Sequence, residues 1–303
     1  MYRRQFLTRS MAAAGSLVAA PTFAIAELAM GDATLTTVSD GTLLLPRSFT
    51  LAGLPEAEAG RILEANGVTG DQLTPPCNVT LYRDGTNTVL FDVGSGDTFM
   101  PTAGTLLDSL DAIGVTADDI THVVFTHGHP DHLWGLLDDF GDIAFANAAF
   151  HMGQAEWDYW TNPETVNTID AERQAFAVGA ARRLEALADQ IALFDGGDTV
   201  LPGIEAVATY GHTPGHMSFA LDAGGQQAFI IGDAIGNHHV SFAHPEWQIG
   251  SDQDPATGAA TRTALMDRLA VDDTTVVGFH LPEGGIGRVE RSGDGYRFAP
   301  LDG

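Results

Sequence analysis

The chain of 303 residues is predicted to adopt an α+β fold, a four-layer αββα sandwich in which two sheets pack together and helices lie outside. Three observations predict this fold. The predicted elements run strands, helix, strand, helix, and then strands, helix and strand again, as in two similar halves. Seven His and Asp residues follow apolar runs, where strand ends and loops would meet along one edge. The hydrophobic fraction of 44%, without low-complexity tracts, is typical of a globular chain.

In the N-terminal half, short apolar runs predict strands and apolar residues at helical spacing predict helices. The predicted strands are Leu35–Val38, Val79–Arg83, Thr88–Asp92 and Val123–Thr126. The predicted helices are Pro55–Ala65, Leu106–Ile113 and Asp131–Phe140. The segment 43–76 is long for a connection between strands, and we expect it to be a lid or a binding extension.

The C-terminal half repeats this order with a hairpin, a helix and a further strand. The predicted strands are Ile204–Thr209, Met217–Leu221, Ala228–Ile231, Thr275–Phe279, Gly287–Glu290 and Tyr296–Phe298. The predicted helices are Ala171–Asp189 and Thr257–Leu269. We therefore expect residues 27–303 to form a single domain.

The net charge of −26 comes from 40 acidic residues against 14 basic ones, all of them Arg. So acidic a chain disfavours nucleic acid and anionic membrane as partners. Solubility or a saline habitat explains the acidic charge.

Cys77 is the only cysteine in the chain, which excludes a disulfide within the chain and a Cys-rich zinc site. Most such cysteines are small, buried hydrophobic residues.

Residues 1–26 have the composition of a signal peptide. Arg3 and Arg4 open it, a small apolar stretch covers 11–20, and Ala24–Ala26 provides a cleavage site. The adjacent arginines resemble a bacterial twin-arginine signal, which predicts export to the periplasm. An ordinary secretory signal or an uncleaved anchor are the alternatives. The apolar stretch is too short to span a bilayer, so no stable membrane insertion is expected after cleavage.

The seven His and Asp residues have the chemistry of metal ligands. Four lie in the run 127–132, directly after an apolar strand, and three follow later apolar runs. The seven are His127, His129, Asp131, His132, His212, Asp233 and His280. Imidazole and carboxylate groups together suit zinc above all, while manganese, cobalt and iron also accept them. Three His with a shared carboxylate can hold one ion, and two His with two carboxylates a second, about 3.5–4 Å away.

This pattern, His-x-His-x-Asp-His followed by His, Asp and His, resembles the metallo-β-lactamase superfamily over 35–298. The resemblance implies the αββα fold and a two-metal site. It implies that the first ion binds His127, His129 and His212, and that Asp233 bridges the two ions. It also implies that the second ion binds Asp131, His132 and His280, with Asp92 supporting the site from behind or serving as a structural residue.

Departures from the family pattern narrow the expected branch. The commonest β-lactamases place a Cys where Asp233 stands, so penicillin hydrolysis is not expected. Acyl-homoserine lactonases carry a Tyr three residues further on, where this chain has Gly236. The residues 278–289 and the long segment 43–76 look most like the methyl parathion hydrolase branch. That branch contains esterases, lactonases and organophosphate hydrolases that often dimerise, which makes a homodimer possible.

The function predicted from these observations is an exported dinuclear zinc hydrolase. A hydroxide bridging the ions would attack a small ester, lactone or phosphotriester, with Asp131 orienting it and receiving its proton. A mononuclear iron redox enzyme resembling sulfur dioxygenases is the alternative, although the complete second ligand set favours hydrolysis. A zinc carrier would need a His-rich flexible loop, which the sequence does not show.

Several further side chains are candidates for the pocket. His238 and His239 follow the bridging Asp and could line it, and Trp160 could form an apolar mouth for aryl or acyl groups. Phe49, Trp157, Tyr159, Phe242 and Trp247 are weaker candidates of the same kind. His216 is expected to support its loop, and His122, His151 and His244 to be structural or on the surface.

Overall fold

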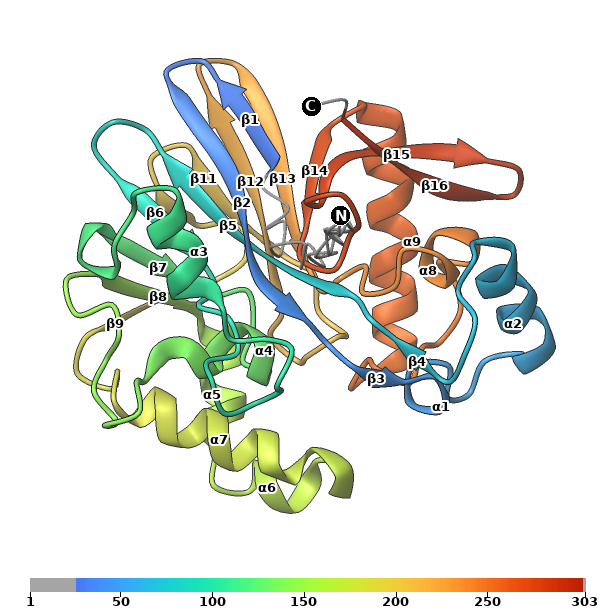
Figure 1. Ribbon diagram of the computed structural model, residues 1–303, viewed down its shortest axis with the longest axis horizontal. Coiled ribbons are helices and arrows are strands. Elements are labelled where there is room, and N and C mark those ends of the chain that lie inside the picture. The colour runs from blue at the N-terminus through green and yellow to red at the C-terminus, as the bar shows by residue number, and fades with distance from the viewer. Residues whose placement is uncertain (1–25, 302–303) are drawn as a thin grey trace, which may run out of the picture.

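Two seven-stranded sheets dominate the structure, a computed structural model that describes residues 26–301 (Figure 1). The predicted signal peptide therefore lies outside the described residues, except for Ala26. The first sheet has, in spatial order, β1 (Ala26–Met30), β2 (Ala33–Thr42), β5 (Pro76–Arg83), β6 (Thr88–Phe91), β7 (His122–Val124), β8 (Ala149–Gly153) and β9 (Ile191–Phe194). The second has β10 (Thr199–Leu201), β11 (Ile204–Ala208), β12 (Met217–Ala223), β13 (Gln226–Gly232), β14 (Thr275–Gly278), β15 (Ile286–Ser292) and β16 (Gly295–Pro300).

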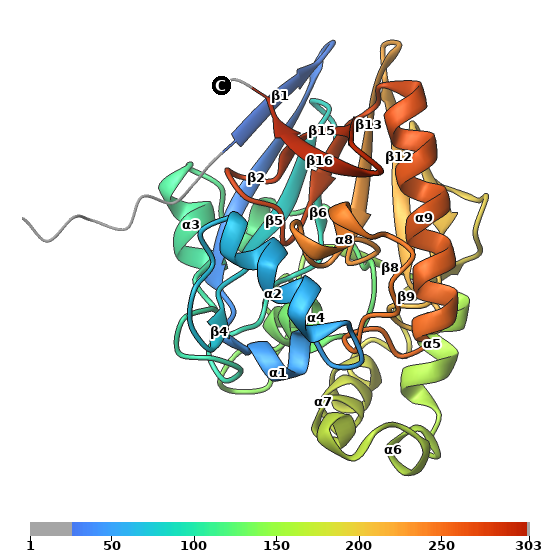
Figure 2. The same cartoon turned by 90° about the vertical axis from the view of Figure 1, so that its right-hand side faces the viewer.

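Helices cover the outer face of each sheet, which confirms the predicted αββα sandwich. The helices beside the first sheet are α3 (Leu106–Ala112), α4 (Pro130–Leu133), α5 (Gln154–Thr161), α6 (Thr165–Thr168) and α7 (Gln174–Glu185). Those beside the second sheet are α8 (Val240–Ala243) and α9 (Pro255–Asp272), and α9 runs along its outer face (Figure 2). None of the helices in residues 26–301 is long and apolar enough to cross a membrane.

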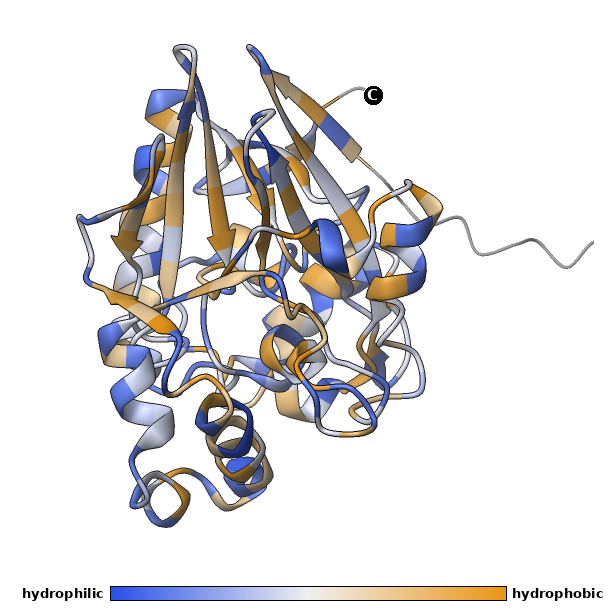
Figure 3. Ribbon diagram, turned by 90° about the vertical axis from the view of Figure 1, so that its left-hand side faces the viewer, coloured by the Kyte–Doolittle hydropathy of each residue, from blue (hydrophilic) through white to orange (hydrophobic). Residues whose placement is uncertain are grey.

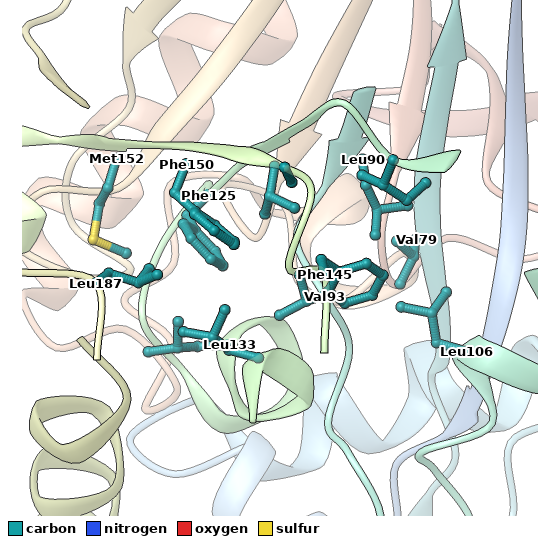
Figure 4. Packing of buried hydrophobic residues seen from close by; sticks show 14 of the residues in the cluster. Val79, Leu90, Val93, Leu106, Phe125, Leu133, Phe145, Phe150, Met152 and Leu187 are labelled. Atoms are coloured by element: carbon teal, nitrogen blue, oxygen red, sulfur yellow. The ribbon is translucent and has the colours of Figure 1, made fainter. Parts of the chain in front are cut away.

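Three apolar cores separate these four layers. Neighbouring residues of one strand alternate between them, with Val123 in the outer core and Val124 in the core between the sheets. Figure 4 shows the outer core, where the rings of Phe125 and Phe150 stack with centroids 6.5 Å apart. Because both faces of the central strands are buried, their sequences read as continuous apolar runs rather than as alternating ones. The hydropathy colouring of Figure 3 shows this concentration of apolar residues in the strands.

Strand direction places the ligand candidates on one edge. Strands β6, β7 and β8 run parallel, as do β13 and β14, so their carboxyl ends share an edge of each sheet. Asp92 follows β6, the 127–132 run follows β7, Asp233 follows β13 and His280 follows β14. Antiparallel β12 begins at this same edge, directly after the loop that carries His212.

The long segment 43–76 crosses to the second half of the molecule. It contains β3 (Leu45–Pro46), α1 (Arg47–Thr50), α2 (Glu56–Ala65) and β4 (Gln72–Leu73). Leu63 and Leu73 of this segment form a small core with Val240 of α8. This core fastens the segment to α8, in the second half of the molecule.

One sequence-based prediction of an element was wrong, and other elements were missed. The helix predicted over Asp131–Phe140 ends early, because α4 is followed by a 3-10 turn (Trp134–Leu136) and by extended Leu137. A Cβ at Gly135 would lie 2.0 Å from the carbonyl oxygen of Val93, so the chain is pressed against another loop there and turns away. Strand β1 and helix α5 were not predicted at all.

Cys77 is fully buried in the outer core, as predicted for a lone cysteine, and burial raises the pKa of its thiol to about 11.

Candidate metal centre

The seven predicted ligands converge into two groups. In each group one potential ligand atom per residue lies within 4.8 Å of all the others. The first group consists of His127, His129 and His212, and the second of Asp131, His132, Asp233 and His280. All seven side chains are buried, with at most 7% of any residue exposed. The division into groups is the one that the family resemblance implied.

The distances within the groups fit ligands that share an ion. One oxygen of Asp233 lies 3.3 Å from His132 Nε2. Its other oxygen lies 3.3 Å from both His212 Nε2 and His280 Nε2, so this carboxylate reaches both groups. Asp131 Oδ2 lies 3.2 Å from His280 Nε2. Ligands about 2.0–2.1 Å from a tetrahedral ion are separated by roughly 3.3 Å, which is the spacing seen here.

Unpartnered atoms show that these residues suit a divalent metal. His127 Nε2, His132 Nε2, Asp131 Oδ2 and Asp233 Oδ1 are all buried and make no hydrogen bond to the described residues. Buried polar atoms without a partner are rare in folded proteins, because each costs about 1–3 kcal/mol. Four such atoms pointing at one another indicate a divalent metal site.

In His132 and His280 the ring nitrogen that faces away from the other ligands, Nδ1, makes a hydrogen bond. His132 Nδ1 lies 2.8 Å from Asp92 Oδ2, and His280 Nδ1 lies 2.7 Å from the carbonyl oxygen of Pro76. Asp92 also accepts from the amide and the hydroxyl of Thr126, next to His127. Such partners fix each ring so that Nε2 faces the ion. The position of Asp92 agrees with the supporting role that the resemblance implied.

Asp252 is a second carboxylate of this kind, and it was not predicted from the sequence. Its Oδ1 lies 3.2 Å from His212 Nδ1, and its Oδ2 accepts from Arg262 Nη1 at 3.0 Å. Both Asp252 and Arg262 are buried. Gln253, the next residue, places its side-chain amide 3.0 Å from His129 Nε2. The loop before α9 therefore orients two ligands of the first group.

We predict that Asp252→Asn weakens the first metal site by about 10- to 100-fold, because removing a carboxylate that orients a ligand His typically has this effect. The substitution also removes the charge that neutralises buried Arg262. Titration of the metal-loaded protein with a competing chelator measures the affinity. Asp254→Asn is the matched control, since Asp254 is two residues away and exposed, and its carboxylate accepts from the amide and the hydroxyl of Thr257. Unchanged affinity in Asp252→Asn would contradict the orienting role.

Glu156 of α5 links the loop that carries His127 and His129 to the loop that carries His212. Its Oε1 accepts from the amide of Gly128 and from the indole of Trp160, and its Oε2 accepts from the hydroxyl of Thr213 and the amide of Gly215. Cβ atoms on these two glycines would lie 2.5 Å from the Trp160 indole and 2.1 Å from the Glu156 amide. Burial raises the pKa of Glu156, whereas four donors favour its ionised form. Only glycine lets α5 approach this closely.

Two of the predicted pocket residues lie elsewhere. Trp160 is fully buried behind His129 with its indole bonded to Glu156, so it supports the loops and is not a wall of the cavity. The rings of His238 and His239 are tilted by 50° to each other, and both residues line a neighbouring cavity together with Asn237, away from the ligand atoms. Burial lowers the pKa of His238 to about 4, which leaves it neutral.

The weaker aromatic candidates divide in the same way. Phe49 does line the cavity at the ligands, as predicted. Phe242 belongs to the core beneath α9, and Trp247 stacks on His244 with ring centroids 4.1 Å apart. The prediction for His216 agrees with the structure, since its Nε2 accepts from the Asp233 amide at 2.9 Å.

The cavity at the ligand groups has a volume of about 100 Å³ and a largely apolar wall. Its apolar lining includes Leu43, Leu45, Phe49, Phe99 and Phe176. Asp131, His212, Asp233 and His280 lie at one side of the cavity, and Arg173 also lines it. Segment 43–76 thus contributes to the wall, as expected, whereas the aromatic candidates Trp157 and Tyr159 do not line this cavity.

Comparisons with known proteins agree with this geometry. A family model described as metallo-beta-lactamase superfamily matches residues 74–280. The hydrolase AbOPH of the beta lactamase superfamily is 28% identical, with a TM-score of 0.85 over 92% of this chain and 98% of its own. AidC, a dizinc quorum-quenching lactonase, is 24% identical with the same TM-score and coverage, a likeness of fold.

More distant structures share the fold as well. A probable metal-dependent hydrolase from Staphylococcus aureus is 18% identical, with a TM-score of 0.71 over 91% of this chain and all of its own. Among curated proteins, none matches the chain significantly.

Proposed function

Because the chain belongs to the metallo-beta-lactamase superfamily and is a metal-dependent hydrolase, we propose that it is a dinuclear zinc enzyme that hydrolyses small esters, lactones or phosphotriesters. The observation that carries the proposal is the pair of complete ligand groups that share the Asp233 carboxylate. A mononuclear iron enzyme would not need the second group. The methyl parathion hydrolase branch remains the branch that we propose.

The chain's own residues suit this chemistry. Two divalent ions bound here would lower the pKa of a water molecule to about 7 and polarise the oxygen of the substrate that gains charge. Asp131, whose Oδ2 lies beside His280 and would bind the second ion, would orient the attacking water with its other carboxylate oxygen and receive the proton there. The apolar wall excludes bulk water and accepts an acyl or aryl group. The lactonase activity of AidC supports lactones as one substrate class.

The experiment that tests the proposal measures metal content and hydrolysis on one preparation. We expect about two zinc ions per chain and turnover of at least one of three substrates, namely a 4-nitrophenyl ester, a γ-lactone and a methyl phosphotriester. One iron per chain with no hydrolysis would overturn the proposal. The substrate that is turned over identifies the bond type.

We also propose twin-arginine export to the periplasm, on the basis of the sequence of residues 1–26. Replacing Arg3 and Arg4 by lysine should leave the protein in the cytoplasmic fraction of a bacterial host, whereas the native chain should appear in the periplasmic fraction. Periplasmic protein from both versions would argue for an ordinary secretory signal.

We also propose a homodimer, as the resemblance to the methyl parathion hydrolase branch suggests. Light scattering during gel filtration measures the mass of the protein in solution and tests this proposal.

A further inference from the structure

Arg173 is a buried cation in the wall of the metal-side cavity. It ends the short 3-10 turn Ala171–Arg173 that leads into α7, and its residue is only 4% exposed. It lines the same cavity as His129 and Phe176. No other Arg lines that cavity among residues 26–301, and the chain has no Lys. Arg173 therefore places a permanent positive charge in the wall of this cavity, in a protein whose net charge is −26.

The hydrogen bonds of Arg173 are incomplete. Its Nη2 donates to the carbonyl oxygen of Gly250 at 2.6 Å, and its guanidinium carbon lies 5.7 Å from the centre of the Phe49 ring. Its Nη1 is buried and has no partner among the described residues. Within 26–301 it forms no ion pair, and the nearby carboxylate of Asp252 is already bonded to Arg262 and His212. Nη1 therefore lacks an acceptor, and no carboxylate of the described residues lies within 4.0 Å to neutralise the guanidinium.

A purely structural role explains only part of this arrangement. The bond to Gly250 ties α7 to the loop that carries Asp252, but it uses one amine of the guanidinium. Burying a charged group without a partner is expensive, and a guanidinium stays protonated at any accessible pH. An anionic oxygen is the acceptor that best compensates such a group, because charge-assisted hydrogen bonds are about twice as strong as neutral ones.

We propose that Arg173 is a substrate-binding residue that recognises an anionic oxygen, and that the preferred substrate is therefore an ester or lactone that also carries a carboxylate. The proposal rests on the proposed hydrolase function for the reaction, but not for the binding of the anion. The ligand side of the cavity would hold the bond that is cleaved, and Arg173 would hold the carboxylate within the apolar wall.

Matched esters test this preference. The substrates are the 4-nitrophenyl monoesters of glutaric and adipic acid, with 4-nitrophenyl hexanoate as the neutral counterpart. Arg173→Met should lower kcat/KM for the monoesters by about 10- to 100-fold, mainly through KM, because a charged hydrogen bond is lost. The hexanoate should change less than about twofold. Arg173→Lys should retain part of the preference, since it keeps the charge but not the planar donor geometry.

Arg182→Met is the matched control, because Arg182 lies on α7 as well but is exposed. It should leave the preference for the monoesters unchanged. Equal losses on charged and neutral esters in Arg173→Met would overturn the proposal and leave a structural role. The same conclusion would follow if the wild-type enzyme favoured the hexanoate.

Binding to the metal-free protein separates this inference from the proposed function. Calorimetry with adipate should detect binding to the wild-type protein and to Arg182→Met, and at least about tenfold weaker binding to Arg173→Met. Should the protein hydrolyse none of the ester, lactone and phosphotriester substrates while adipate binding depends on Arg173, the anion site stands and the proposed function fails. Should esters be hydrolysed while adipate binding ignores Arg173, the proposed function stands and the anion site fails.

Discussion

Replacing Asp233 with alanine is expected to lower metal content and activity together. Among residues 26–301, this carboxylate is the only one that approaches ligands of both groups, with one oxygen 3.3 Å from His132 and the other 3.3 Å from His212 and His280. Without it, metal content should fall from about two ions per chain to at most about one. We expect kcat/KM to fall by at least about 10³-fold, which corresponds to roughly 4 kcal/mol of transition-state stabilisation.

Elemental analysis and initial rates on the same preparation measure both effects. Asp294→Ala is a suitable control, because Asp294 is exposed in the turn between β15 and β16 and should retain both ions. A circular dichroism spectrum establishes that the variant is folded. Two ions and full activity in Asp233→Ala would show that the two groups do not act as one centre.

Glu156→Gln is expected to lower metal affinity and thermal stability, although Glu156 is not itself a metal ligand. The amide has one oxygen in place of two, so its NH2 group must face either Gly128 and Trp160 or Thr213 and Gly215. Leaving two buried donors without an acceptor costs roughly 2–5 kcal/mol. We expect Tm to fall by about 5–10 °C and metal affinity to fall by about 10- to 100-fold, since both ligand loops lose their common anchor.

Thermal unfolding and chelator competition are the measurements. Asp158→Asn is the matched control, because it makes the same chemical change at an exposed position of α5 and should shift neither quantity appreciably. If Glu156→Gln kept the metal affinity and lost only stability, Glu156 would be part of the fold and not of the metal centre's support.

The ligands could be predicted because each has a local signature. Six residues in a row carry four of them, and His212, Asp233 and His280 follow apolar runs or lie in a turn with Gly and Pro. The fold followed from the same runs, since strands buried on both faces are continuous in sequence. The order of elements then placed the ligands on one edge.

The supporting residues could not be predicted, because nothing local distinguishes them from surface residues. Glu156 lies in a polar stretch beside exposed Asp158, and Arg173 follows exposed Glu172. Asp252 belongs to a polar run whose visible role is to start α9, where Asp254 caps the helix. Their functions arise from contacts between residues far apart in the sequence, separated by 28 positions for Glu156 and Gly128 and by 40 for Asp252 and His212. Trp160 was assigned to the pocket because sequence cannot tell which side of a helix faces a cavity.

Each ligand group takes residues from both sheets, and this arrangement connects folding to the supply of metal. His127 and His129 follow a strand of the first sheet, whereas His212 precedes a strand of the second, and the other group is divided in the same way. An ion bound to either group therefore fastens the two halves of the sandwich together. At a free concentration 100 times the dissociation constant, one such ion adds about 2.7 kcal/mol to the free energy of unfolding. The thermal midpoint should thus rise with the logarithm of metal concentration, so that scarcity of metal limits the lifetime of the folded chain as well as its turnover.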